Sequence, residues 1–244
     1  MLAFFILTLS FIKINLSMTI FENILFDIKN VKVIDETIPL NKYVAIDLSV
    51  SHTELSKKFL ENPDNFEKFI LNYLDMNKAQ VAFGGYNEER NLYNKYALFN
   101  DGETEERNIH IGLDIWAKAG TPVLAVLEGT VHSFNLNTGS GNYGPTIILK
   151  HKVGSYEFYT LYGHLSIESI ENIEIGDTFK RAAQLGTLGD AAINGNYAPH
   201  LHFQIIIDLE DGFGDYPGVC TKSEREHFLK NCPDPNFLLK LEKL

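Results

Sequence analysis

Four histidines and one aspartate stand in settings where they could do chemistry together. The pattern His110-x-x-x-Asp114 pairs an imidazole with a carboxylate, His164 follows a glycine, and His200-x-His202 supplies two more imidazoles. Two neutral imidazoles and one carboxylate can hold a zinc ion and leave its fourth position for water. Further imidazoles beside such a site can take up a proton or stabilise an oxyanion. These residue types therefore predict metal-assisted hydrolysis.

The histidine pair lies in a segment, 200–207, whose Ile and Phe content and preceding Pro199 predict a β-strand. Alternate residues of a strand face opposite sides, so His200, His202 and Gln204 share one face and the apolar residues between them share the other. Two histidines in this register lie about 7 Å apart at the backbone. One can then bind a metal while the other reaches bound water. The alternative is a polar sheet face with two solvated histidines.

His110 and Asp114 would face the same side of a straight strand but lie about 13 Å apart, which is long for sharing one ion. Gly112 between them permits a bend that would bring them together. No HExxH motif is present, so a thermolysin-like arrangement is excluded. The other histidines lack such partners and are expected to be structural or solvated: His52, His132, His151 and His227.

The elements that must position these residues are short strands. Fifteen of the eighteen glycines lie from Gly112 onward, between runs rich in Val, Ile, Tyr, Phe and Leu. These runs predict strands over residues 122–127, 130–134, 146–151, 157–162 and 200–207. Their spacing predicts an antiparallel sheet without βαβ units. The expected fold is mainly β (a β-rich α+β protein).

The region before this sheet predicts a small mixed α/β cap without chemistry. Residues 31–34 and 43–48 are typical of short strands. The motif Ser51-x-x-Glu54 predicts a capped helix to about Glu61, and Asn62-Pro63-Asp64 begins a second helix with apolar residues at helical spacing. After the sheet, Ser223-x-x-Glu226 predicts a short capped helix, and Pro233-Asp234-Pro235 ends it before a helical tail.

We therefore expect four parts in the chain: residues 1–17, a cap over 18–100, a β-sheet core over 101–220 and a tail over 221–244. Cys220 and Cys232 lack CxxC spacing, which disfavours a thiolate zinc site. We expect them to be free thiols, and one disulfide stays an alternative. The net charge of −11 disfavours nucleic acid as a partner, because phosphate binding needs clustered Lys and Arg.

The first seventeen residues leave two alternatives open. Residues 2–12 are apolar and uncharged, the length of a signal-peptide core and too short for a membrane span. No positive residue precedes them, and Met18 offers a second start. A start at Met18 predicts a cytoplasmic protein and is slightly favoured. If residues 1–17 are part of the protein, they predict export or membrane anchoring. Only in that case do we expect a membrane as a partner.

The motifs that contain these histidines resemble those of a known family. His110-x-x-x-Asp114, Tyr162-Gly163-His164 and His200-x-His202, together with the glycines between them, are similar to the motifs of the lysostaphin-type zinc metallopeptidases. These enzymes are peptidoglycan endopeptidases with the site in a groove of a small antiparallel β-sheet. The resemblance covers about residues 108–208.

Carried over by position, the resemblance implies one zinc ion per chain, with His110, Asp114 and His202 as its ligands. It implies His164 and His200 as the catalytic histidines. The expected function is zinc-dependent hydrolysis of peptide bonds, with peptidoglycan cross-link or stem peptides as the default substrate. The alternatives are a non-catalytic binding module of the same fold and an intracellular hydrolase of another small amide.

The flanking segments resemble a narrower subset of the family. Gly84-Gly85-Tyr86-x-Glu88-x-Arg90, Asp215-Tyr216-Pro217-Gly218 and Asn231-Cys232-Pro233-Asp234-Pro235 are similar to the peptidase-like unit joined to class-III aminotransferase chains. Such units often lack secretion signals. This resemblance therefore weighs against a cell-wall substrate.

Overall fold

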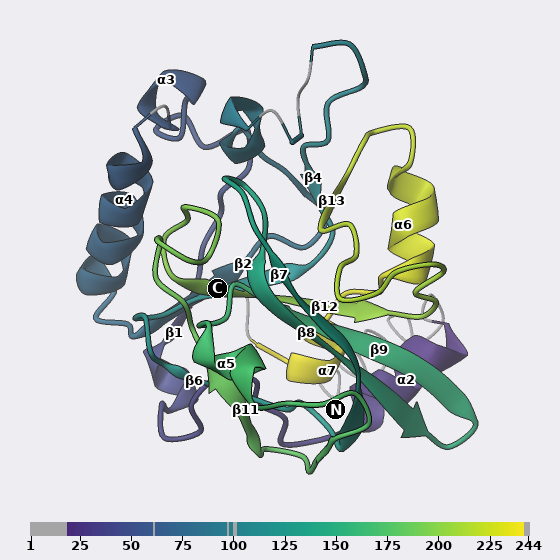
Figure 1. The fold of residues 1–244 in the computed structure, drawn as a ribbon. Coiled ribbons are helices and arrows are strands. Elements are labelled where there is room, and N and C mark those ends of the chain that lie inside the picture. The colour runs from purple at the N-terminus through teal and green to yellow at the C-terminus, as the bar shows by residue number, and fades with distance from the viewer. Residues whose placement is uncertain (1–18, 61, 97, 100–101, 242–244) are drawn as a thin grey trace, which may run out of the picture.

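The computed structural model describes residues 19–60, 62–96, 98–99 and 102–241. Its largest element is an eight-stranded sheet with the strand order β1-β2-β5-β12-β9-β8-β7-β10 (Figure 1). The strands of this sheet are β1 (Tyr43–Ala45), β2 (Val81–Gly84), β5 (Leu113–Trp116), β7 (Gly129–Asn137), β8 (Gly144–Val153), β9 (Tyr156–Gly163), β10 (Thr178–Phe179) and β12 (His200–Ile206). The β-rich prediction is confirmed. Neighbouring strands are antiparallel except at one edge, where β1 and β2 pair in parallel.

Two smaller sheets complete the β structure of the described residues. One has the order β13-β4-β3 and joins three segments far apart in the chain: β13 (Val219–Cys220), β4 (Ile109–His110) and β3 (Glu88–Glu89). The other pairs β11 (Gln184–Thr187) with β6 (Pro122–Leu124). The first of these sheets brings His110 beside the C-terminal part of the chain.

The helices are short apart from one. They are α2 (Ile20–Asp27), α3 (Lys57–Leu60), α4 (Pro63–Met76), α5 (Glu168–Glu171), α6 (Arg225–Asn231) and α7 (Asn236–Leu239), with 3₁₀ turns η1 (Leu40–Lys42) and η2 (Leu92–Lys95). Helix α4 begins where the sequence predicts. The side chain of Asn62 accepts a hydrogen bond from the Asp64 backbone N–H at 3.0 Å, and Pro63 opens the first turn. Phe66 and Ile70, one turn apart, are buried against the sheet.

Three local predictions were wrong. Residues 31–34 form no strand, since Ile34 makes only an isolated bridge to Val123. Ser51 begins no helix, because its hydroxyl bonds with that of Ser49; helix α3 begins six residues later, where the Ser56 hydroxyl accepts from the Phe59 N–H.

The third error concerns the last part of the chain. Helix α6 exists, but Ser223 does not cap it, because the Ser223 hydroxyl donates to Glu105. Pro235 does precede a new helix, α7, as expected. Cys220 and Cys232 are free and buried, so the free-thiol prediction is confirmed.

The central strands β5 and β12 divide the molecule into a packing face and a site face. On the packing face, Leu201, Phe203 and Ile205 are completely buried, with Leu113 and Ile115 beside them. Burying each such side chain stabilises the fold by about 1.5–3 kcal/mol. Residues of the opposite alternation line the site. The histidines and Gln204 on the site face of β12 are therefore carried by a strand that is buried on both faces.

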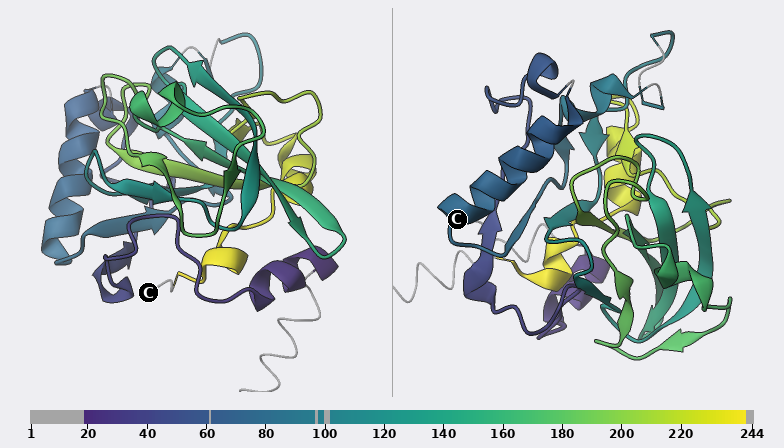
Figure 2. Two further views of the ribbon diagram at one scale, coloured as in Figure 1. Left: turned by 60° about the horizontal axis from the view of Figure 1, so that its bottom comes forward. Right: turned by 60° about the vertical axis from the view of Figure 1, so that its left-hand side comes forward.

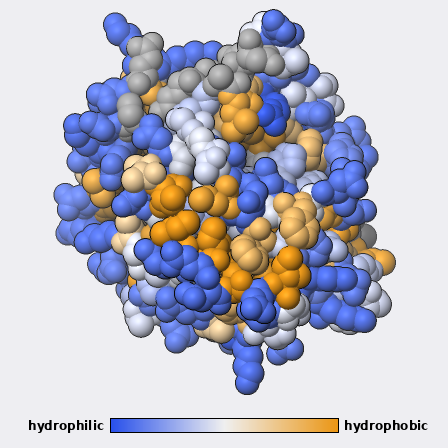
Figure 3. Space-filling view, in the orientation of Figure 1, coloured by the Kyte–Doolittle hydropathy of each residue, from blue (hydrophilic) through white to orange (hydrophobic). Residues whose placement is uncertain are grey.

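The cap and the long strands lie at opposite sides of the molecule (Figures 1 and 2). Helix α4 covers the edge that β1 and β2 form, while β7, β8 and β9 make up the other side. Hydrophilic residues surround a group of apolar residues below the middle of the face in Figure 3. Among the described residues, no helix is long and apolar enough to cross a membrane. The segment 1–17 and the proposed start at Met18 lie outside the described residues.

Candidate metal centre

The pairing of β12 with β5 places His202 directly opposite Asp114. Side chains opposite each other on one face of an antiparallel pair lie within about 5.5 Å at Cβ. Here the His202 Nδ1 atom lies 3.1 Å from Asp114 Oδ1. A single register between two strands therefore joins residues 88 positions apart.

The chain bends at Gly112, as the sequence predicts. Strand β4 ends at His110 and β5 begins at Leu113, and the two strands belong to different sheets. A Cβ atom on Gly112 would lie only 2.5 Å from the His202 ring, so this position needs glycine for the close approach. The bend brings His110 Nε2 to 3.2 Å from Asp114 Oδ1.

The three potential ligand atoms form a nearly equilateral triangle. Its edges are 2.9 Å (His110 Nε2 to His202 Nδ1), 3.1 Å (His202 Nδ1 to Asp114 Oδ1) and 3.2 Å (His110 Nε2 to Asp114 Oδ1). Zinc bonds to imidazole and carboxylate of about 2.0–2.1 Å in a tetrahedron require ligand atoms about 3.3 Å apart. This donor set therefore fits a small tetrahedral cation. Among the described residues, it is the one group of three or more His, Cys, Asp or Glu side chains whose ligand atoms lie close enough together to hold a metal ion.

The far atom of each candidate ligand is held by a hydrogen bond. His110 Nδ1 donates to the Gly85 carbonyl at 2.8 Å, and His202 Nε2 donates to Gln204 Oε1 at 2.9 Å. These bonds leave His110 Nε2 and His202 Nδ1 as the free lone pairs, since a neutral imidazole carries one proton. Partners of this kind fix the tautomer and ring orientation of metal-ligating histidines.

Asp114 is held by a buried arginine. Arg90 has no exposed surface, and its Nη1 donates to Asp114 Oδ2 at 2.6 Å while its Nε donates to Glu88 Oε2 at 2.5 Å. Nη1 also donates to the Tyr93 hydroxyl at 3.1 Å. One carboxylate oxygen of Asp114 therefore binds the guanidinium, and the other faces the two histidines.

The remaining two histidines lie beside the cluster. His164 Nδ1 donates to the Asn194 carbonyl and His200 Nδ1 donates to the Ala198 carbonyl, each at 2.8 Å, so both Nε2 atoms keep a free lone pair. Their ring centroids are 4.2 Å apart, and His200 Nε2 is 3.8 Å from Asp114 Oδ1. Trp116 stacks on His200 at 5.6 Å and fixes its plane.

His164 adopts a strained backbone conformation. Its φ of 64° lies in the left-handed region, which costs a residue other than glycine about 1–3 kcal/mol. Gly163 before it admits the Tyr143 ring, which lies 2.7 Å from where a Cβ atom would be. The backbone therefore turns sharply at the end of β9 and carries the His164 ring over His200.

Burial disfavours the charged form of three imidazoles in the cluster, those of His110, His164 and His200. Burial lowers the pKa of His110 to about 4, although the Asp114 charge opposes this shift. Burial also lowers the pKa of His200, and together with the neighbouring His200 it holds the pKa of His164 well below the usual range. Burial alone would raise the pKa of Asp114, but His110 and Arg90 hold it well below its ordinary value. Neutral imidazoles with an ionised carboxylate are the protonation states that metal binding needs.

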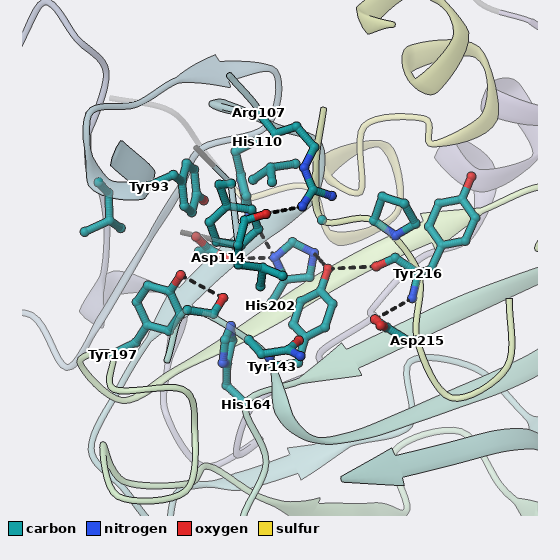
Figure 4. Close-up of a pocket in the computed structure, with 18 of the residues that line it drawn as sticks. Tyr93, Arg107, His110, Asp114, Tyr143, His164, Tyr197, His202, Asp215 and Tyr216 are labelled. Atoms are coloured by element: carbon teal, nitrogen blue, oxygen red, sulfur yellow. Dashed lines mark hydrogen bonds and ion pairs between the residues drawn. The ribbon is translucent and has the colours of Figure 1, made fainter. Parts of the chain in front are cut away.

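The cluster opens into a cavity of about 470 Å³. Figure 4 shows Tyr93, Tyr143 and Tyr197 around the histidines, with Arg107 beside His110. The Tyr143 hydroxyl donates to the Tyr216 carbonyl at 3.1 Å, and the Tyr197 hydroxyl donates to the Gly141 carbonyl at 3.1 Å. These bonds fix two aromatic walls of the site.

All five residues singled out in the sequence come together in this cavity, and none of them is more than 5% exposed. The alternative of two solvated histidines on a polar face is therefore wrong. The other histidines line no part of it, and His151 is a buried structural residue bonded to the Glu128 carbonyl and the Thr160 hydroxyl. Which of the five bind a metal and which act on substrate stays a prediction.

Sequence reasoning missed the contribution of the cap. We expected no chemistry from residues 19–78 and only a turn followed by polar residues over 83–90, yet Arg90 anchors Asp114, the Gly85 carbonyl orients His110, and Tyr93 lines the cavity. The only signal was the motif Gly84-Gly85-Tyr86-x-Glu88-x-Arg90, which combines glycines with a carboxylate and a cation. It lies 24 residues from Asp114, so its connection to the site depends on tertiary contact.

A histidine–aspartate–histidine cluster on a β-sheet, with two more histidines beside it, is a set of side chains that fits a metallohydrolase site. Residues 108–211 match the model of peptidase family M23. This segment, which is less than half of the chain, is similar to the peptidase domains of that family, and its relatives include lysostaphin.

Relatives share this part of the chain. A Haemophilus influenzae protein described as an uncharacterized metalloprotease is 30% identical over 137 residues, which are 54% of this chain and 27% of that protein. Lysostaphin of Staphylococcus staphylolyticus is 32% identical over 118 residues, 48% of this chain and 21% of lysostaphin. The matched segments thus span about a quarter of the length of these curated relatives. The crystallised catalytic domain of lysostaphin from Staphylococcus simulans aligns over 55% of this chain and 80% of its own, with 26% identity and a TM-score of 0.38.

Proposed function

We propose that the chain hydrolyses peptide bonds with one zinc ion held by His110, Asp114 and His202. The observation that supports this proposal most directly is the triangle of their ligand atoms, with edges of 2.9–3.2 Å. Bound zinc would polarise the scissile carbonyl and lower the pKa of water at the site. Imidazole and carboxylate suit zinc, and the buried thiols of Cys220 and Cys232 are not part of the cluster.

His164 and His200 are the proposed catalytic residues. Each keeps its proton on Nδ1, bonded to a backbone carbonyl, and presents a free Nε2 lone pair. At neutral pH both imidazoles are neutral, because burial lowers the pKa of each. Either Nε2 can therefore accept a proton during attack on the carbonyl. The imidazolium so formed can donate to the oxyanion or return the proton to the leaving amine.

Peptidoglycan cross-link and stem peptides are the substrate class that the family resemblance implies. Incubating the zinc-loaded chain with muropeptides, glycine-rich peptides and short unbranched peptides, followed by mass analysis, tests the proposal. We expect cleavage that a chelator abolishes and zinc restores. Full zinc occupancy without cleavage of any peptide would refute the enzyme proposal in favour of a binding module.

A further inference from the structure

The cavity is walled by segments that lie outside the M23 domain of residues 108–211. Phe66, Leu92 and Phe99 come from the segment before the domain, and the stretch 212–219 follows it. The site histidines form the part between these walls. A volume of about 470 Å³ is that of a small-molecule pocket. The flanks therefore limit what can reach the histidines to a ligand of a few residues.

One lining residue carries a positive charge. Among the described residues that line the cavity, Arg107 is the single lysine or arginine, although the chain as a whole has a net charge of −11. An anionic ligand is repelled by such a protein unless a cation meets it locally. Four carboxylates also line the cavity, those of Asp114, Glu210, Asp211 and Asp215, so Arg107 is the one lysine or arginine of this lining that an anionic group could bind.

Toward the described residues, the guanidinium of Arg107 uses only part of its five N–H donors. It donates from Nη2 to the Leu98 carbonyl and stacks on the Phe99 ring, with its carbon 5.4 Å from the ring centroid. No ion pair of Arg107 occurs within the part of the chain that the structure describes; burial raises the pKa of Asp215, which also lines the cavity, and the Arg107 charge opposes this larger effect without a contact between the two. Arg90 differs, because it is fully buried and paired with two carboxylates. Of these two arginines, Arg107 is the one that is partly exposed and able to bind a ligand.

We infer that the cavity binds short peptides with a free carboxylate, and that Arg107 binds that carboxylate. The planar fork of an arginine matches a carboxylate with two parallel hydrogen bonds. Aromatic side chains that line the same cavity, among them Tyr93, Trp116 and Tyr197, suit an apolar side chain of the same peptide. This inference rests on the proposed function and names its substrate class: short free peptides, not the cross-linked polymer.

Binding to an inactive variant tests the inference apart from catalysis. The zinc-loaded His164→Ala chain is titrated calorimetrically with N-acetylated tripeptides of alanine and phenylalanine, as free acids and as C-terminal amides. A charge-assisted hydrogen bond predicts that the acid binds about 10- to 100-fold more tightly than the amide. Arg107→Gln, added to the same chain, should remove this preference, and Arg107→Lys should retain part of it.

Arg225→Gln is the matched control, since it removes the same charge from an exposed arginine on α6 that lines no part of the cavity. It should leave the acid preference unchanged. Equal binding of acid and amide, no binding of either, or an undiminished preference in Arg107→Gln would overturn the inference. Cleavage of cross-linked muropeptides but not of short free peptides by the unsubstituted chain would overturn it too, while the proposed function would stand.

Discussion

Replacing Arg90 by methionine should destabilise the metal-free protein by about 3–5 kcal/mol, the usual cost of removing one partner of a buried ion pair. Arg90 is completely buried and binds Asp114 at 2.6 Å and Glu88 at 2.5 Å. Methionine fills much of the same space, but it leaves both carboxylates without their cation. Asp114 is only 3% exposed, so water cannot replace the lost hydrogen bond.

The size of this effect makes it measurable. For a domain of 150–250 residues, each kcal/mol lowers the melting temperature by about 2–4 °C, so the variant should melt about 6–20 °C below the parent. Urea unfolding followed by circular dichroism, in the presence of a chelator, gives the free energy directly. Adding Glu88→Gln to the variant should recover part of the loss, because one of the two stranded charges is then neutral.

Lys150→Met provides the control for a lost cation. Lys150 pairs with Glu157 at 3.2 Å, but the two side chains are 40% and 53% exposed. Removing an exposed pair of this kind should change stability by about 0–1 kcal/mol. If Arg90→Met unfolded within 1 kcal/mol of the parent, as the control should, the buried pairing described here would be incorrect.

Three further outcomes follow from the site and its surroundings. Asp114→Ala should lose zinc and activity together, and full zinc occupancy after mild chelation, measured by metal analysis, would contradict the proposed ligand set. His164→Ala and His200→Ala should keep zinc yet lose about 10²–10⁴-fold in turnover; loss of zinc in His200→Ala with retention in His202→Ala would reverse the roles within that pair. Burial lowers the pKa of His151 from 6.5 to about 4, so its contribution to stability is present above pH 6.5 and is lost as the pH falls towards 4. That contribution is about 3 kcal/mol, and unfolding curves between pH 7 and 4 should show a flatter pH dependence for His151→Gln.

Local patterns predicted the elements whose residues determine their own conformation. Asn62 and Pro63 start α4 because a side-chain cap and a fixed φ act within one turn. The alternation in β12 predicted which residues face the site, since a strand has a period of two. The helix predicted from the Ser51 motif does not form, because the Ser51 hydroxyl bonds with the Ser49 hydroxyl and does not cap a helix. The local sequence offers both hydrogen bonds and does not decide between them.

The sequence by itself indicated the five residues that could do chemistry together and the glycine that lets two of them, His110 and Asp114, come close. Their types and spacing restrict the chemistry, and Gly112 is needed because no side chain fits against the His202 ring. The tertiary structure decided how the site is held and how large it is. Arg90 reaches Asp114 only because β3 pairs with β4, and Arg107 faces a cavity only because the segments on either side of the M23 domain fold back over it. Such contacts join residues far apart in the chain, where burial and sheet register, not local spacing, set the geometry.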